Sequence, residues 1–187
     1  DAMDIEGFSE ATATQLIRTL GVRHCSDLYF LDAKQLSALE GWGEKKTQNL
    51  LAALESSKTV PLERFLLALG IGGVGKVASR DLAQRFLSVE ALAAATEEQL
   101  VGMENIGEKT AADIRAWFSD PENAAEVARL FEAGVRPFMP QRQAAGVFAG
   151  ESVVLTGTLS SMPRSRAQQE IEARGGTCQS AVTSKTT

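Results

Sequence analysis

The chain contains 187 residues, of which 44% are apolar and 23% charged, and its formal net charge is −5. This is enough apolar sequence for a core, and no run approaches the roughly 18 apolar residues of a membrane span, so we expect a soluble, cytoplasmic protein without a membrane partner. The two cysteines lie far apart in unlike surroundings, which excludes a disulfide framework and a thiolate metal cluster.

Charge is unevenly distributed along the chain. Residues 1–134 contain 13 Lys and Arg against 21 Asp and Glu, a net of −8, whereas residues 135–187 contain 6 against 3, a net of +3. This asymmetry indicates two units. Proteins that hold nucleic acid by bulk attraction usually present a basic surface, so any nucleic-acid site on the acidic first unit must act locally.

A five-residue pattern of apolar, any, small, apolar and small residues recurs along the first unit. The copies read IEGFS, LEGWG, IGGVG and MENIG, and their starts are 34, 32 and 32 residues apart. Such regular spacing indicates an internal repeat. We call the copies hairpins 1 to 4, which comprise residues 5–9, 39–43, 71–75 and 103–107.

Helical sequence surrounds the copies. Before hairpins 2, 3 and 4 come DAKQLSAL with Asp32 as N-cap, PLERFLLALG with Pro61 in its first turn, and TEEQLVG with Thr96 as N-cap. After each copy, apolar residues recur on one helical face. We therefore predict a mainly α unit of four tandem helix-hairpin-helix motifs, arranged as two pseudo-symmetric pairs. A small residue stands four positions beyond each copy, at Ala13, Thr47, Ser79 and Ala111.

Residues 70–76, GIGGVGK, also fit two nucleotide-binding patterns, G-x-G-x-x-G and the P-loop G-x-x-x-x-G-K. Both patterns need a buried strand leading into the glycines, whereas a leucine-rich helix is predicted there. The P-loop also needs Ser or Thr after its lysine, and this chain has Val77. A nucleotide site is therefore disfavoured, and no acid–base constellation suggests a catalytic residue.

A glycine turn before a helix exposes successive N–H groups beside the positive end of the helix dipole, which makes an anion site. Such a site can hold a phosphate even on an acidic domain. Lysines in the first helical turn favour this function, although solvated lysines balanced by Glu44 and Glu108 are the alternative. The candidate DNA-binding residues are Gly7, Ser9, Gly41, Gly43, Lys45, Lys46, Gly73, Gly75, Lys76, Asn105, Gly107, Lys109 and Thr110.

Backbone donors that face backbone phosphates carry no sequence information. The expected partner is thus duplex DNA of any sequence, with the hairpins of one pair on the two strands across a minor groove. Hairpins 2 and 3 should bind best, because Ser9 and Asn105 replace glycines in the other two. The apolar tip residues are more typical of packing than of wedges between bases; they are Phe8, Trp42, Val74 and Ile106.

Beyond hairpin 4, Asp120 and Pro121 start another helix, which ends at Gly134. Residues 135–147 contain two prolines and no period, and predict a linker. SVVLTG, SRAQQEIEAR and TCQSAV then predict strand, helix and strand. The predicted domains are a helix-hairpin-helix DNA-binding domain over 1–134, the linker, and an incomplete small α/β domain over 148–187.

The hairpins, the linker and the tail that begins FAGESVVLTGTL closely resemble the C-terminal part of bacterial NAD-dependent DNA ligases. LEGWGEKK, FLLALGI, GVG and LTGTL are specific in combination, and the resemblance spans essentially all 187 residues. It implies that the hairpin domain grips DNA around a nick, in replication and repair. It also implies that the tail is the first half of a BRCT domain, with Thr156 and Gly157 as phosphate contacts.

In that family a separate domain takes AMP from NAD onto a lysine and passes it to the 5′ phosphate of the nick. The K-x-D-G motif of this lysine and the family's four-cysteine zinc module are absent from the sequence. The resemblance therefore implies a monomeric, nucleoid-associated ligase fragment that clamps nicked DNA beside its own N-terminal catalytic domains and is inactive alone. NAD, magnesium and zinc are expected only for the full-length enzyme.

Two other functions fit the residues. A non-catalytic repair scaffold could use the same hairpins on nicked or branched DNA and its tail to recruit a protein. A helical interaction module could use the glycines only to shape its turns.

Overall fold

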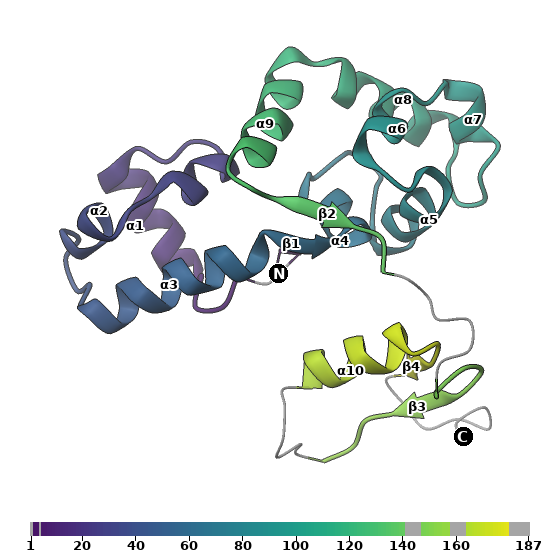
Figure 1. Cartoon of the computed structure of the whole chain (residues 1–187). Coiled ribbons are helices and arrows are strands. Elements are labelled where there is room, and N and C mark those ends of the chain that lie inside the picture. The colour runs from purple at the N-terminus through teal and green to yellow at the C-terminus, as the bar shows by residue number, and fades with distance from the viewer. Residues whose placement is uncertain (1, 4, 141–146, 158–163, 180–187) are drawn as a thin grey trace. The chain divides into compact units, whose positions relative to one another are not determined.

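The computed structural model describes residues 2–3, 5–140, 147–157 and 164–179, drawn as coloured ribbon in Figure 1. It forms two compact units, Asp1–Met139 and Pro140–Thr187. Helices dominate, as predicted. None of the helices in the described ranges has the length and apolar character needed to cross a lipid bilayer.

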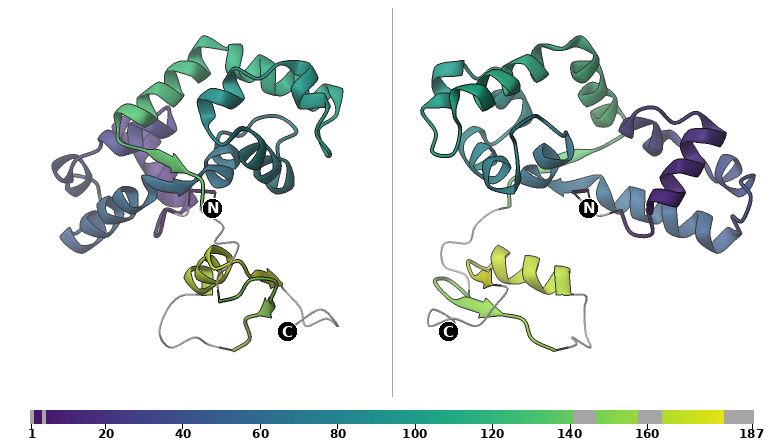
Figure 2. Two further views of the ribbon diagram at one scale, coloured as in Figure 1. Left: turned by 45° about the vertical axis from the view of Figure 1, so that its right-hand side comes forward. Right: turned by 180° about the vertical axis from the view of Figure 1, so that it is seen from behind.

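The first unit consists of short helices joined by tight turns, seen from two further sides in Figure 2. Hairpin 1 leads into α1, and hairpin 2 joins α2 to α3. Hairpin 3 joins α4 to α5, hairpin 4 joins α7 to α8, and α9 follows. The helices are α1 Glu10–Leu20, the 3-10 helix η1 Cys25–Phe30, α2 Ala33–Ser37, α3 Glu44–Ser57, α4 Leu62–Ala68, α5 Lys76–Phe86, α6 Val89–Ala93, α7 Glu97–Val101, α8 Glu108–Ser119 and α9 Pro121–Glu132.

The first unit has two halves, one around hairpins 1 and 2 and the other around hairpins 3 and 4. Each half has its own apolar core, built from the helix faces around its pair of hairpins. Fully burying one leucine contributes about 1.5–3 kcal/mol, so each core contributes substantially to stability. Tyr29 of η1 packs against both cores. The first core comprises Leu16, Leu28, Leu36, Leu39, Trp42, Leu50 and Leu54. The second core includes Phe65, Leu66, Val74, Leu82, Leu92, Leu100, Ile106, Ala111, Ile114 and Val135.

A short parallel ladder joins distant parts of the first unit. β1, Thr59–Pro61, pairs with β2, Arg136–Phe138, and Val135 is fully buried beside it. The prediction that the linker starts at residue 135 is therefore wrong. Periodicity in residues 135–139 could not reveal the ladder, because its partner strand lies far away in the sequence.

The predicted N-caps are confirmed. The Asp32 carboxylate accepts the Gln35 N–H at 2.7 Å, and Thr96 Oγ1 accepts the Gln99 N–H at 3.3 Å. At the start of α9, the Asp120 carboxylate accepts a backbone N–H at 2.8 Å and Pro121 follows in the first turn. Local capping chemistry thus sets where these helices begin.

The second unit follows the predicted order of strand, helix and strand. β3, Ser152–Val154, pairs in parallel with β4, Thr177–Gln179, and α10, Arg164–Ala173, makes the crossover that parallel pairing requires. Gly176 is tightly enclosed, because an added Cβ would lie 2.6 Å from a methyl carbon of Ile171. Assignment of this unit to a BRCT domain stays a prediction.

Leu87 ends α5 in a left-handed conformation, with φ of 65°, and its side chain is 62% exposed. This conformation costs a residue with a Cβ about 1 kcal/mol relative to glycine. We therefore expect Leu87→Gly to raise the free energy of unfolding in urea by about 1 kcal/mol. Leu87→Ala keeps the Cβ and should give no such gain, so an equal gain from alanine would contradict this account.

Candidate functional site

The four hairpins share one backbone conformation. In each, the N–H of the fourth residue donates to the carbonyl of the first, and the third residue has a positive φ, the pattern of a type II turn. The repeat seen in the sequence is therefore also a repeat of structure. The positive φ values are 75° at Gly7, 76° at Gly41, 75° at Gly73 and 70° at Asn105.

The fifth residue of each hairpin is the N-cap of the helix that follows. Its backbone is extended, and its carbonyl accepts the N–H of the small residue four positions later at 2.9 to 3.1 Å. Three of these small residues are buried, which lets each helix approach its core closely. The N-caps are Ser9, Gly43, Gly75 and Gly107, and the buried small residues are Thr47, Ser79 and Ala111.

Glycine serves different purposes at the third and fifth positions. At the third position the positive φ requires glycine or a tolerant residue such as Asn105. At the fifth position Gly43, Gly75 and Gly107 have ordinary extended angles, and an added Cβ would meet nothing within 4 Å. The fold alone therefore does not explain glycine at the fifth position.

Three of the hairpin helices lack a side-chain cap. The first-turn amides of α3, α5 and α8 have no side-chain acceptor at their glycine N-caps, whereas Ser9 of hairpin 1 accepts the Thr12 N–H at 3.2 Å. By contrast, α2, α6, α7 and α9, which do not directly follow a hairpin, are capped by side chains such as those of Asp32 and Ser88. The amides after hairpins 2, 3 and 4 are thus open to an external acceptor, and all three glycines are exposed.

Lysines stand beside these open amides. Lys45, Lys76 and Lys109 lie in the first turns of α3, α5 and α8 and are exposed. Within the described ranges, no carboxylate oxygen lies within 4.0 Å of their ammonium groups, so Glu44 and Glu108 do not form ion pairs with them. These cations remain available to an anion bound at the amides.

Lys46 differs from the other three lysines. Its Nζ lies 4.3 Å from the centre of the Trp42 ring, so part of its charge interacts with the aromatic face. Trp42 itself is only 6% exposed. Val74 and Ile106 at the tips of hairpins 3 and 4 are also buried, and Phe8 is half-buried against the first core. The tip residues therefore pack in the cores, as predicted.

Hairpins 3 and 4 contact each other's helices. Asn105 Nδ2 of hairpin 4 donates to Asp81 Oδ2 of α5 at 3.2 Å. In return, hairpin 3 lies against α8, where a Cβ added to Gly73 would be 2.8 Å from Thr110 Oγ1 and one added to Gly72 would be 3.3 Å from Asp113 Oδ2. This exchange makes the two hairpins one structural pair.

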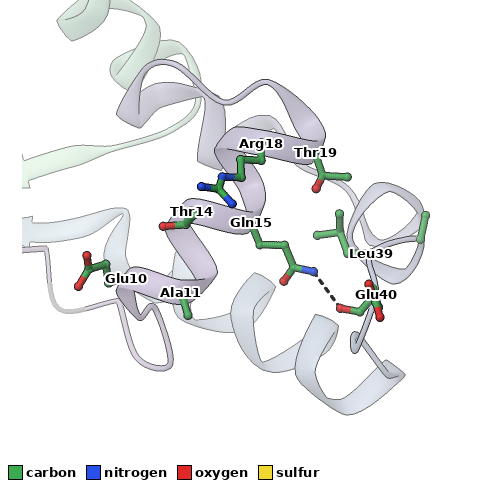
Figure 3. A pocket seen from close by; sticks show the side chains of 9 residues that line it. Glu10, Ala11, Thr14, Gln15, Arg18, Thr19, Leu39 and Glu40 are labelled. Atoms are coloured by element: carbon green, nitrogen blue, oxygen red, sulfur yellow. Dashed lines mark hydrogen bonds between the residues drawn. The ribbon is translucent and has the colours of Figure 1, made fainter.

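Hairpin 2 contacts the helix of hairpin 1 in a similar way. Gln15 of α1 accepts the Trp42 indole N–H at 2.7 Å and donates its own amide to the Glu40 carbonyl at 2.8 Å, as Figure 3 shows for the second bond. Gln15, Asp81 and Asp113 all stand six residues beyond a hairpin. Sequence reasoning missed these residues, although their constant distance from the hairpins was a visible signal.

A shallow depression of about 750 Å³ lies between α1 and the segment that enters hairpin 2. Its lining mixes Arg18 with the acidic Glu10 and Glu40, whose side chains Figure 3 shows around it.

In the second unit, the candidate phosphate contacts Thr156 and Gly157 follow β3 and are exposed, with φ of 73° at Gly157. No three His, Cys, Asp or Glu side chains within residues 2–3, 5–140, 147–157 and 164–179 are grouped to hold a metal ion.

Gly73 gives a test of the hairpin geometry itself. Gly73→Ala should lower the free energy of unfolding by about 1–3 kcal/mol, because it combines a positive φ with a contact of 2.8 Å to Thr110 Oγ1. Gly75→Ala, at an open extended position, should change it by less than about 1 kcal/mol. Urea unfolding of the two variants measures the difference, and equal losses would contradict the distinct roles of the two positions.

Two family models match the first unit. Residues 1–56 match a model described as a SAM-like helix-hairpin-helix tandem, and residues 64–127 match one described as a helix-hairpin-helix motif. The first match contains hairpins 1 and 2, and the second contains hairpins 3 and 4. The boundary between the two matches agrees with the pairing of hairpins in the structure.

Curated proteins named DNA ligase match the whole chain. The identity is 45% to the protein of Shouchella clausii over 100% of this chain, and 40% to that of Myxococcus xanthus over 99%. It is 41% to the protein of Synechococcus sp. strain JA-3-3Ab over 100% of this chain. The chain spans only 28 to 29% of the length of these relatives.

Proposed function

Because this chain belongs to the family of proteins named DNA ligase, we propose that its first unit is the part of such an enzyme that binds duplex DNA. The supporting observation is the open N-terminal amides of α3, α5 and α8, each preceded by an exposed glycine that the fold does not require. These amides would donate to DNA phosphate oxygens, where the helix dipole favours negative charge.

The glycines allow a phosphate to approach the backbone closely. At Gly43, Gly75 and Gly107 a side chain would project into open space next to the amides, so its absence leaves room for an incoming anion. Lys45, Lys76 and Lys109 would add charge-assisted contacts to the same phosphates. Local donors and cations of this kind make binding possible on a unit whose net charge is negative.

The arrangement of hairpins suits two DNA strands. Hairpins 3 and 4 exchange contacts, and hairpin 2 contacts the helix of hairpin 1, so each pair is held as one piece. In our proposal, the two hairpins of a pair contact phosphates on opposite strands across one minor groove. Because the donors are backbone groups and lysines, binding would be independent of base sequence.

Hairpin 1 would bind least. Ser9 Oγ already accepts the Thr12 N–H and lies 3.1 Å from Thr12 Oγ1, so its own side chain occupies a donor that remains open in the other hairpins. In hairpin 4, Asn105 keeps the φ that glycine has elsewhere. We therefore propose that hairpin 4 joins hairpins 2 and 3 as a phosphate contact.

Within the complete ligase, this unit would hold nicked duplex beside the enzyme's own N-terminal catalytic domains, in replication and repair. NAD dependence, with magnesium and zinc, belongs in this proposal to the portion of the relatives that the chain does not span. Thr156 and Gly157 would contribute a phosphate contact from a BRCT-like second unit. The names of the relatives favour this role over that of a non-catalytic scaffold.

Binding of fluorescently labelled duplexes to the whole chain tests the proposal. Two duplexes of unrelated sequence should give anisotropy midpoints within about threefold of each other, and log K should fall linearly as log salt rises. A nicked duplex of the same sequence should bind at least as well as the intact one. Absence of binding at low salt, or a strong dependence on base sequence, would overturn the proposal.

A further inference from the structure

Contacts between distant residues join the two hairpin pairs, in addition to the chain that runs between them. The covalent path runs from α3 through β1 into α4. One such contact is made by α9, which follows hairpin 4 and packs on η1 of the first half, where Tyr29 packs against both cores. Another is made by Arg64 Nε of α4, which donates to the Ala2 carbonyl at 3.0 Å. In Figure 1, α9 returns from the second half towards the helices of the first.

A buried serine forms the centre of this contact. Ser26 of η1 is fully buried, and it donates its backbone N–H to one carboxylate oxygen of Glu126 at 2.7 Å and its hydroxyl to the other at 2.5 Å. The carboxylate of α9 thus satisfies two donors in the first turn of η1. A charged acceptor makes these hydrogen bonds stronger than neutral ones.

An ion pair lies beside the serine. Arg129 of α9 donates to an Asp27 carboxylate oxygen at 2.6 Å, and the Asp27 carboxylate also accepts the backbone N–H groups of Arg23 and His24, each at 2.9 Å. These two backbone hydrogen bonds, with Arg129, lower the pKa of Asp27 to about 2. Arg129 also lies over the Phe30 ring, 5.8 Å from its centre.

These side chains belong to neither core. The first core is made by helices around hairpins 1 and 2 and the second by helices around hairpins 3 and 4, while Ser26, Asp27, Glu126 and Arg129 lie between them. Their contacts join residues about 100 positions apart in sequence. Removing them would therefore leave each hairpin pair with its own core intact.

We propose that η1 and α9 form a clasp that fixes the orientation of the two hairpin pairs, so that both pairs bind one duplex together; this rests on the proposed function. Glu126 and Arg129 are positioning residues in this clasp. Linking two binding modules in a fixed geometry raises the affinity of the whole above that of either module, and the gain falls when the link becomes loose. The clasp therefore matters for long duplexes and not for short ones.

The double variant Glu126→Ala/Arg129→Ala tests the clasp in the whole chain. On a duplex long enough to reach both pairs, its affinity should fall roughly tenfold or more, whereas on a duplex reaching only one pair it should stay within about twofold of the parent. Titrations with a series of duplex lengths show the length at which the double variant begins to bind more weakly than the parent. The matched control, Lys34→Ala/Glu132→Ala, removes one charge of each sign from exposed positions and should match the parent at every length.

Hydrogen exchange provides a readout that needs no DNA. The Ser26 amide should exchange faster in the double variant than in the parent, because it loses its acceptor, while amides within α3 and α5 keep their protection. Ser26→Ala, which removes only the hydroxyl donor, should show smaller effects in the same direction and replaces the double variant if that one does not fold. The proposed clasp is wrong if the double variant loses the same affinity for duplexes of every length, or loses affinity for none of them.

The two proposals fail differently. If the parent binds no duplex of any length, the proposed DNA-binding function is wrong, and the clasp is judged by exchange alone. Unchanged exchange at Ser26 in a folded double variant would then overturn the clasp.

Discussion

A chain carrying Gly43→Leu and Gly75→Leu is expected to fold and to bind duplex DNA about 100-fold more weakly than the parent. Each charge-assisted phosphate contact contributes about 1.5–3 kcal/mol, and losing two of them costs at least about 3 kcal/mol, or roughly two orders of magnitude in Kd. The fold should survive because both positions have extended backbone angles and open space around an added Cβ.

The matched control places the same side chain elsewhere on the same helices. Ala52→Leu/Gln84→Leu adds leucine at exposed positions of α3 and α5 away from the hairpins, and it should bind DNA as the parent does. Circular dichroism and urea unfolding establish that all variants are folded. Unchanged affinity in a folded Gly43→Leu/Gly75→Leu chain would contradict phosphate binding by the hairpins. It would favour the alternative hypothesis that the glycines only shape turns.

A double variant with serine at the same two positions separates an effect on DNA binding from an effect on stability. Gly43→Ser/Gly75→Ser should give hairpins 2 and 3 the cap that Ser9 gives hairpin 1, where its hydroxyl accepts a first-turn N–H at 3.2 Å. Stability should then hold or rise by a few tenths of a kcal/mol, while DNA affinity falls because the amides are occupied. Greater stability together with weaker binding cannot come from partial unfolding.

Replacing Lys45, Lys76 and Lys109 by Gln together should reduce both the affinity and its dependence on salt. Each phosphate contact releases counterions and contributes about 0.9 to the slope of log K against log salt, so the slope should become shallower by about 2.7. These lysines are exposed and have no carboxylate partner within 4.0 Å among the described residues, so little stability should be lost. Anisotropy titrations at several salt concentrations measure the slope.

Two single variants serve as comparisons for the salt dependence of the triple variant. Lys34→Gln, at an exposed position of α2 outside the hairpins, should leave the slope unchanged. Lys46→Gln should change it by less than one of the three lysines does, because its Nζ interacts with the Trp42 ring. A triple variant with the parent's slope would show that these lysines do not contact phosphates, whatever the affinity does.

Local sequence was sufficient for the hairpins and for the helix starts beside them. The constant spacing of the four copies predicted the turns, and Asp32, Thr96 and Asp120 predicted helix starts that the structure confirms. These features depend on side chains and backbone groups only two to four residues apart. Their free energy is therefore determined within short segments, which a sequence pattern can reveal.

The sequence could not separate the two kinds of glycine in each hairpin. Gly41 and Gly43 look alike in LEGWG, and so do Gly73 and Gly75 in IGGVG. In the structure, the first of each pair has a positive φ and the second has an extended backbone with open space. Only the dihedral angles and the neighbouring atoms decide which glycine serves the fold and which is free for a ligand.

By itself, the sequence determined the repeat, its register, the helix after each hairpin and the helices before hairpins 2, 3 and 4. The tertiary structure decided the β1–β2 ladder, the pairing of hairpins within each half through Gln15 and Asp81, and the contact of Glu126 with Ser26 that joins the two halves. Each of these contacts joins residues 24 or more positions apart. Such contacts form only when the whole chain folds, because their favourable free energy must exceed the entropic cost of closing long loops.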